Sequence, residues 1–185
     1  MTRSTARTTA SLAIGFAMIA ASGAATAQSK TSADKVAQDK TAIVRHANTP
    51  PGLILQAVTV PTGATMLYLS GQLASPIDPG KKVAPADLTI ADFGDTKTQT
   101  ISVFTKIKAI LAAQGFAMSD IIKLTVFVAG DPKLGGRMDF AGMNDAFKMF
   151  FATADNPNTV ARSTVQVAAL AGPAFLVEIE ATAAK

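Results

Sequence analysis

Two stretches of alternating residues near the C-terminus constrain the fold of this chain most strongly. They are Val160–Val167 and Phe175–Glu180. Because successive side chains of a strand point to opposite faces, the alternation predicts two β-strands. Arg162 belongs to a polar set on the first strand, and Glu178 and Glu180, the only glutamates of the chain, share one face of the second. The pattern thus places an arginine and a glutamate pair on two consecutive strands.

A short segment that contains Ala171–Pro173 joins the two stretches, so we expect them to be neighbours in a sheet. In that arrangement Arg162 and Glu178 form a compact pair, in which the guanidinium holds a carboxylate and the glutamate moves a proton. The alternative is a cross-strand salt bridge on a sheet face, and the strand pattern taken alone favours this structural interpretation.

The first 27 residues have the pattern of a secretory signal peptide. Arg3 and Arg7 precede an apolar run at 12–21, and Ala25-Thr26-Ala27 supplies small residues for a cleavage site. The apolar run is shorter than the about 20 residues that span a bilayer. We therefore expect a protein that begins at Gln28, is exported to a Gram-negative periplasm and keeps no membrane segment.

The exported chain is nearly neutral and lacks several kinds of reactive group. Loss of Arg3 and Arg7 leaves 15 basic against 13 acidic groups, a net charge of +2. With no basic stripe and interleaved aromatic residues, composition argues against nucleic-acid binding. The absence of cysteine excludes disulfides, thiolate metal sites and a cysteine nucleophile. His46 is the only histidine, and no neighbour in the sequence supports a catalytic role for it, so we do not assign it to a site.

The remaining patterns predict a polar, flexible N-terminal arm at 28–42 and one two-layer α+β domain at 43–185. Its two helices should cover one face of a mixed sheet. The other face, to which we assign Leu124 or its neighbours, is expected to be buried against identical subunits. The expected elements are a short strand at Ile43–His46, a hairpin of Leu53–Val58 and Met66–Gln72, a loop at Leu73–Gly94, a helix at 96–114, a strand at Ile121–Val128, a helix at 139–153 and the two C-terminal strands.

Between Leu53 and Ala183 the chain resembles the Rid family (RidA/YjgF, reactive intermediate deaminases). The blocks that carry the resemblance occur in family order and are Ser70-Gly71-Gln72, Gln114-Gly115, Lys123–Val128, Met143-Asn144, Phe150-Phe151, Ala161-Arg162-Ser163 and Val177–Glu180. The resemblance implies a chorismate-mutase-like fold and a homotrimer with clefts between subunits. It also implies hydrolysis of enamines and imines such as 2-aminoacrylate to 2-keto acids and ammonia, without a cofactor or metal.

The resemblance also implies roles for individual residues. Arg162 stands where the family arginine binds the substrate carboxylate, and Glu178 matches the glutamate that handles water or a proton. Gly71 matches a glycine whose backbone lines the same cleft. Asn144 matches a recurrent helix asparagine that is interpreted as structural.

Two positions depart from the family pattern. Ile54 stands where many deaminating members have a tyrosine, and Thr164 stands where they often have a cysteine. Thr164 still offers a hydroxyl to a substrate, whereas Ile54 offers no hydrogen bond.

The leading hypothesis is a deaminase of small 2-imino acids. The alternative is a non-catalytic trimer that binds small carboxylates or acts as a holdase for exported proteins.

Overall fold

The computed structural model describes residues 1, 42–82, 84 and 87–185. The predicted signal peptide at 1–27 and arm at 28–42 fall almost wholly outside these residues, and both stay predictions. The described domain lies within a compact unit at Asp39–Lys185.

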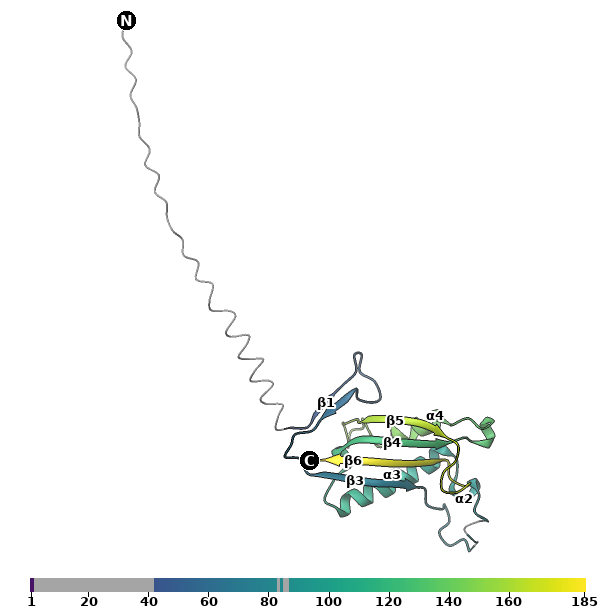
Figure 1. Ribbon diagram of the computed structural model, residues 1–185. Coiled ribbons are helices and arrows are strands. Elements are labelled where there is room, and N and C mark those ends of the chain that lie inside the picture. Colours follow the sequence, from purple (N-terminus) through teal and green to yellow (C-terminus); the bar gives the residue numbers. More distant parts are fainter. Residues whose placement is uncertain (2–41, 83, 85–86) are drawn as a thin grey trace. The chain divides into compact units, whose positions relative to one another are not determined.

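One layer of the domain is a four-stranded mixed sheet with the order β3-β6-β4-β5 (Figure 1). Strand β6 is antiparallel to both of its neighbours, whereas β4 and β5 run parallel. A second, two-stranded sheet pairs β1 with β2. The strands are β1 (Val44–His46), β2 (Ala57–Thr59), β3 (Met66–Leu73), β4 (Ile121–Ala129), β5 (Ala161–Val167) and β6 (Val177–Ala184).

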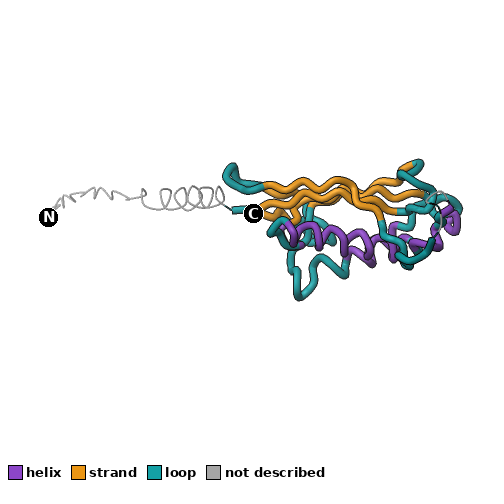
Figure 2. The backbone as a smooth tube through the Cα atoms, turned by 90° about the horizontal axis from the view of Figure 1, so that it is seen from below, coloured by secondary structure: helices purple, strands orange, loops and turns teal. Residues whose placement is uncertain are grey.

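The helices form the second layer, on one side of the strands (Figure 2). The longest, α3 (Thr96–Ala113), begins where the Asp95 carboxylate accepts a hydrogen bond of 2.8 Å from the Thr98 backbone amide. Helix α4 (Phe140–Phe147) begins in the same way, because Asp139 accepts from the backbone amide of Gly142 at 2.8 Å. These caps satisfy amide groups that a helix start leaves free.

Several helix boundaries differ from the sequence predictions. Helix α3 ends as expected, with Gly115 at φ +74° just beyond it. The second helix was expected to reach residue 153, but α4 stops at Phe147. The loop expected at Leu73–Gly94 contains the short helix α2 (Ile90–Phe93). Single 3₁₀ turns lie at Met118–Asp120 and Pro132–Leu134. In the part of the chain described here, no helix is long and apolar enough to cross a membrane.

The expected hairpin of Leu53–Val58 and Met66–Gln72 is wrong. Strand β2 pairs with β1, and β3 pairs with the C-terminal β6. Long-range contacts decide this outcome: the Arg45 side chain of β1 donates to the carbonyl groups of Ser119 and Ile121, and Leu55 forms a bridge with Ala161 at the start of β5. Two turn-separated apolar runs therefore belong to different sheets.

The core lies between the sheet and the helices. On β4 the side chains of Leu124, Val126 and Val128 are fully buried and meet Phe104 of α3 and Phe147 of α4 within one apolar cluster. This arrangement confirms the predicted two-layer α+β architecture. It also corrects the assignment of Leu124 to the open face of the sheet, because that side chain lies under the helices.

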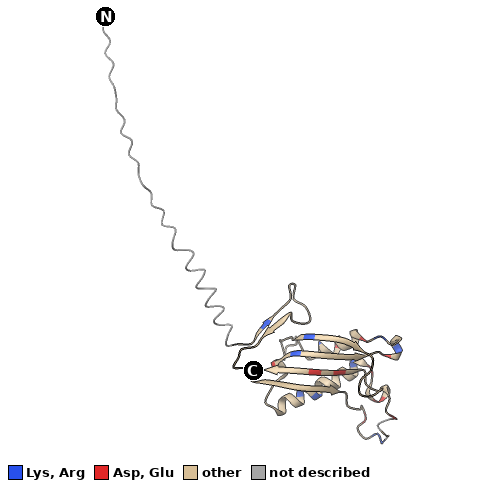
Figure 3. Ribbon diagram, viewed as in Figure 1, with Lys and Arg blue, Asp and Glu red and all other residues tan. Residues whose placement is uncertain are grey.

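The open face of the sheet, which no helix covers, is mixed rather than apolar. In Figure 3 acidic residues fall on β6 and a basic residue on the neighbouring β4, and Glu180 of β6 pairs in register with Thr125 of β4 on this face. Lys123 and Thr125 are only partly buried there, and Tyr68 of β3 is 74 % exposed. Strong apolarity of this face, which motivated the predicted burial against identical subunits, is absent. The trimer remains a prediction that must rest on other grounds.

Candidate functional site

Arg162 is the centre of the candidate site and lies on the helix side of edge strand β5. It pairs in register with the buried Leu124 of β4, and paired residues of a sheet point to the same face. Its Nη2 donates to Asn144 Oδ1 of α4 at 2.8 Å. Its Nη1 lies 3.8 Å from Met143 Sδ, and its guanidinium carbon lies 4.5 Å from the centre of the Phe147 ring. Helix α4 therefore fixes the guanidinium plane through three side chains.

The charge of Arg162 has no acidic partner among the described residues. The ion pairs found there join Lys81 to Asp92 and Lys148 to Asp145. The Nε atom of Arg162 is buried without a hydrogen-bond partner, and burial lowers the pKa of the guanidinium. A guanidinium carries five N–H donors in a planar fork that matches a carboxylate. The guanidinium therefore keeps donors that no group in the described residues satisfies.

Thr164 adds a second unsatisfied group on the same face. It lies two residues beyond Arg162 on β5 and pairs with the buried Val126. Its Oγ1 is buried and has no hydrogen-bond partner in the described part of the chain. Gln166, next on this face, binds the carbonyl group of Gly136 and is thereby satisfied. Two of the four unpaired buried side-chain atoms in the described residues therefore belong to Arg162 and Thr164, and such atoms are costly unless another group pairs with them.

Glu178 lies elsewhere, on the open face of the sheet. It pairs with Phe127 of β4, three residues from Leu124, so alternation turns it away from the helices. Beside it, β3 bulges between Leu69 and Gln72, and a Cβ added at Gly71 would overlap the Glu178 carboxylate. Gly71 and Glu178 thus form one unit, in which the missing side chain of glycine makes room for the carboxylate.

The expected neighbourhood of Arg162 and Glu178 within one chain is wrong. Strand β4 lies between β5, which carries Arg162, and β6, which carries Glu178. The two side chains also occupy opposite faces of the sheet. The alternative of a cross-strand salt bridge is wrong for the same reason. Residues 168–176 form a connection long enough to carry the chain past β4, so the short segment that contains Ala171–Pro173 does not join adjacent strands.

The other residues from the sequence analysis divide between these two units. Ile54 is partly buried against the core, and its neighbour Leu55 bridges to Ala161, so Ile54 lies near the start of β5. Asn144, interpreted as structural, contacts Arg162 directly. The structure therefore brings Ile54, Asn144, Arg162 and Thr164 to one region and keeps Gly71 with Glu178.

Sequence reasoning missed the contacts of Met143 and Phe147 with Arg162. Both belong to the apolar stripe of α4 and were assigned to the core, where they are fully buried. Their spacing of four residues around Asn144 places all three on neighbouring positions of one helix surface. Outside this region, His46 binds Thr59 Oγ1 on the exposed small sheet. Among the residues described, no cluster of three metal-binding side chains occurs.

Comparisons with known proteins agree on one class. A family model described as endoribonuclease L-PSP matches residues 56–185. A RutC family protein of Pyrococcus horikoshii is 36% identical over 142 residues, which cover 76% of this chain and 93% of that protein. A 2-iminobutanoate/2-iminopropanoate deaminase of Escherichia coli K12 is 33% identical over 146 residues, which cover 79% of this chain and 98% of that protein.

The fold has a solved counterpart as well. YyfB of Yersinia pestis, a conserved Rid family protein of unknown function, superposes with a TM-score of 0.53 at 26% identity, covering 72% of this chain and 87% of that one. Fold and site thus define a mixed-sheet α+β domain of the Rid type. The chain belongs to the endoribonuclease L-PSP family, the family of the RidA/YjgF proteins, as its sequence blocks predict.

Proposed function

We propose that this protein hydrolyses small 2-imino acids and their enamine tautomers, such as 2-aminoacrylate, to 2-keto acids and ammonia. One observation carries the proposal: the half-buried Arg162 guanidinium has spare donors and no acid beside it in the described residues, while Thr164 offers a second unsatisfied group. A substrate carboxylate would satisfy these donors. A relative that bears the name of an imine deaminase supports the chemistry at 33% identity.

We propose further that the complete site forms between subunits of a homotrimer. Arg162 and Glu178 stand on opposite faces of one sheet, so a single chain does not direct both at one small substrate. Arg162 lies on β5, the edge strand of the four-stranded sheet, and the bridge from Leu55 covers only the start of this edge among the described residues, so the rest offers access to another copy. A neighbouring subunit that presents its Glu178 and Gly71 to this edge would complete the site.

In the proposed reaction an enamine first tautomerises to its imine by proton transfer to the β-carbon. Arg162 holds the carboxylate. Glu178 takes a proton from a water molecule while the oxygen of that water molecule bonds to the imine carbon. Glu178 returns this proton to the imine nitrogen, which gives a carbinolamine. The proton of the carbinolamine hydroxyl then passes to nitrogen as the carbon–nitrogen bond breaks, which leaves a keto group. The products are a 2-keto acid and ammonia. Backbone donors near Gly71 would stabilise the tetrahedral species.

The non-catalytic alternative uses the Arg162 region alone. That region contains the anion receptor and the apolar side chain of Ile54, and it contains no acid to activate water in the described chain. Such a protein would bind 2-keto acids and leave the imine to spontaneous hydrolysis. A holdase role has no comparable local observation in its favour.

One experiment separates the two functions. A pyridoxal-phosphate-dependent serine dehydratase generates 2-aminoacrylate in the presence of the exported form of the protein, and pyruvate is followed with time. We expect pyruvate to form faster than in the dehydratase reaction alone, and Glu178→Gln to abolish the acceleration. Binding of pyruvate in calorimetry without any acceleration by wild-type protein would favour the carboxylate binder.

A further inference from the structure

A second candidate binding site lies on the helix layer, away from Arg162. It is a hollow of about 390 Å³ between the C-terminal half of α3 and the segment that follows α4. We call it the Lys108 hollow and define it by Lys108, Phe116, Met118, Met149, Phe150 and Asp155. Its volume falls within the range of small-molecule sites. None of the side chains that contact Arg162 belongs to this set.

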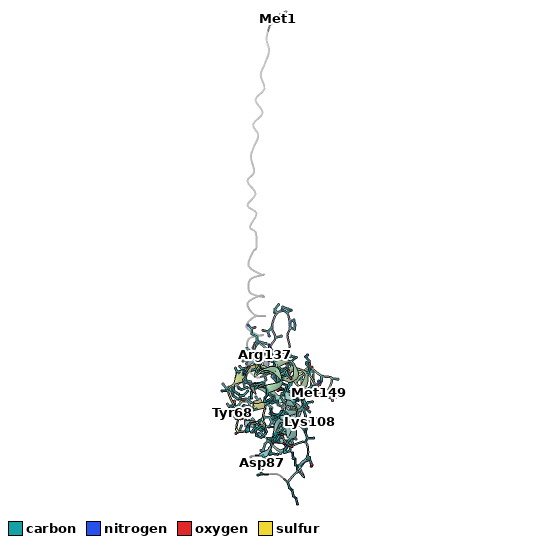
Figure 4. All side chains as sticks on the ribbon, turned by 90° about the vertical axis from the view of Figure 1, so that its right-hand side faces the viewer. Met1, Tyr68, Asp87, Lys108, Arg137 and Met149 are labelled. Atoms are coloured by element: carbon teal, nitrogen blue, oxygen red, sulfur yellow. The ribbon has the colours of Figure 1, made fainter. Side chains whose placement is uncertain are left out.

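The walls of the hollow are apolar and partly open to solvent. Phe116 and Met118 are each only 8 % exposed and form buried walls, whereas Met149 is 56 % exposed. Figure 4 shows the labelled side chains of Met149 and Lys108 on the same flank of the molecule. A large exposed methionine beside buried aromatic residues offers an adaptable surface for an apolar ligand.

Two opposite charges border these apolar walls. Lys108 comes from α3 and Asp155 from the turn after α4, and both are exposed. They do not pair with each other, and in the described part of the chain neither forms an ion pair with another residue. A ligand that faces both charges would carry a carboxylate for Lys108 and an ammonium group for Asp155.

A polar atom without a partner occurs in the same wall. The Asn156 side chain is 6 % exposed, and its Nδ2 donates to the Phe150 carbonyl group at 2.8 Å. Its Oδ1 has no partner in the described residues. This oxygen is shielded from solvent, so the wall beside Asp155 contains an unsatisfied acceptor that does not open into the hollow.

We infer that the Lys108 hollow binds a short apolar peptide with free termini, of dipeptide length. An extended dipeptide spans about 7 Å, close to the edge of a cube of the hollow's volume. Its carboxylate faces Lys108, its ammonium group faces Asp155, and its side chains cover Phe116 and Met149.

The test is calorimetry of the exported form of the protein with leucyl-leucine and blocked analogues. We expect leucyl-leucine to bind, and glycyl-glycine, which has the same charges without apolar side chains, not to bind. Leucyl-leucine amide loses the Lys108 contact and N-acetyl-leucyl-leucine the Asp155 contact. Each is expected to bind about fivefold more weakly, as an exposed ion pair permits.

Variants assign these losses to particular residues. Lys108→Gln should weaken the binding of leucyl-leucine as much as replacing its carboxylate by an amide does. The variant should not weaken the binding of leucyl-leucine amide further, because the same contact is removed in both cases. Asp155→Asn should likewise weaken the binding of leucyl-leucine, and it should not weaken the binding of N-acetyl-leucyl-leucine further. Lys97→Gln, about three turns earlier on α3, and Asp87→Asn serve as matched controls and should bind as the wild type does.

Three results would overturn the inference. They are no binding of leucyl-leucine at millimolar concentration, equal binding of the free and blocked dipeptides, or binding that Arg162→Ala abolishes while Lys108→Gln leaves it intact. The last result would place the peptide at the Arg162 region. Because the readout is peptide binding, loss of deaminase activity in any variant does not bear on it.

Discussion

If Arg162 and Glu178 act on one substrate from different subunits, two inactive variants should restore each other. Arg162→Ala removes a charge-assisted contact to the substrate carboxylate. Two such hydrogen bonds contribute on the order of 3 kcal/mol, which corresponds to roughly a hundredfold loss of kcat/KM. Glu178→Gln keeps the shape of the side chain but cannot take a proton, so turnover should fall while pyruvate binding stays.

The two variants are then expressed together with different affinity tags, and mixed assemblies are purified through both tags in turn. In a randomly mixed trimer, a site is complete when its arginine comes from a Glu178→Gln chain and its glutamate from an Arg162→Ala chain. Each trimer that carries both tags contains one such site out of three, so the purified assemblies should show about one third of wild-type activity. The acceleration of pyruvate formation from 2-aminoacrylate measures it.

Failure of complementation would refute the shared site. If mixed assemblies are as inactive as each variant alone, while circular dichroism and light scattering show folded trimers, Arg162 and Glu178 do not meet across a subunit boundary. A monomer in light scattering would remove the premise itself. Arg137→Ala, which changes an exposed arginine outside the site, is the matched control and should keep full activity.

Three further predictions address the local structure. Gly71→Ala should lower activity strongly, because its methyl group overlaps the neighbouring carboxylate, while Gly63→Ala, which meets no atom within 4 Å, should not; steady-state assays compare the two. Asp95→Ala should cost about 1 kcal/mol of unfolding free energy in urea through loss of the α3 cap, with Asp87→Ala as the control. Hydrogen bonds from the backbone amide and the side chain of Thr98 lower the pKa of Asp95, so this contribution should be present above the unfolded pKa of about 3.9 and disappear as the pH falls through the lower folded value. Intact mass of protein from a periplasmic fraction should correspond to a chain that begins at Gln28, and a mass that retains the first residues would refute export by cleavage.

Periodicity predicted the elements that depend on local chemistry. The amphipathic pattern located α3 within a residue or two, and the β-branched run located β4 closely. Alternation also assigned Arg162 and Thr164 correctly to one face of β5. In each case the determining interactions lie within a few residues of one another, so the sequence records them.

Strand order was not predictable in the same way. The pairing of β3 with β6 joins residues more than a hundred positions apart, and the Arg45 contacts join β1 to residues over seventy positions away. No turn or spacing records such contacts, because they depend on which faces fit in the folded core. The error about Arg162 and Glu178 has this origin: closeness in sequence was taken for adjacency in the sheet.

The energetic state of Arg162 connects these findings. A half-buried guanidinium without an acidic partner is unfavourable for the isolated domain, because burial withdraws water that its spare N–H groups would otherwise bind. The Phe147 ring and one amide oxygen recover only part of that loss. A purely structural role would be filled better by an apolar side chain of similar length. An anion that accepts the remaining hydrogen bonds of Arg162 would remove this free-energy cost, so the cost in the free state favours binding. Glu178 of the same chain lies on the opposite face of the sheet, so the glutamate that would act on the bound molecule must come from another subunit.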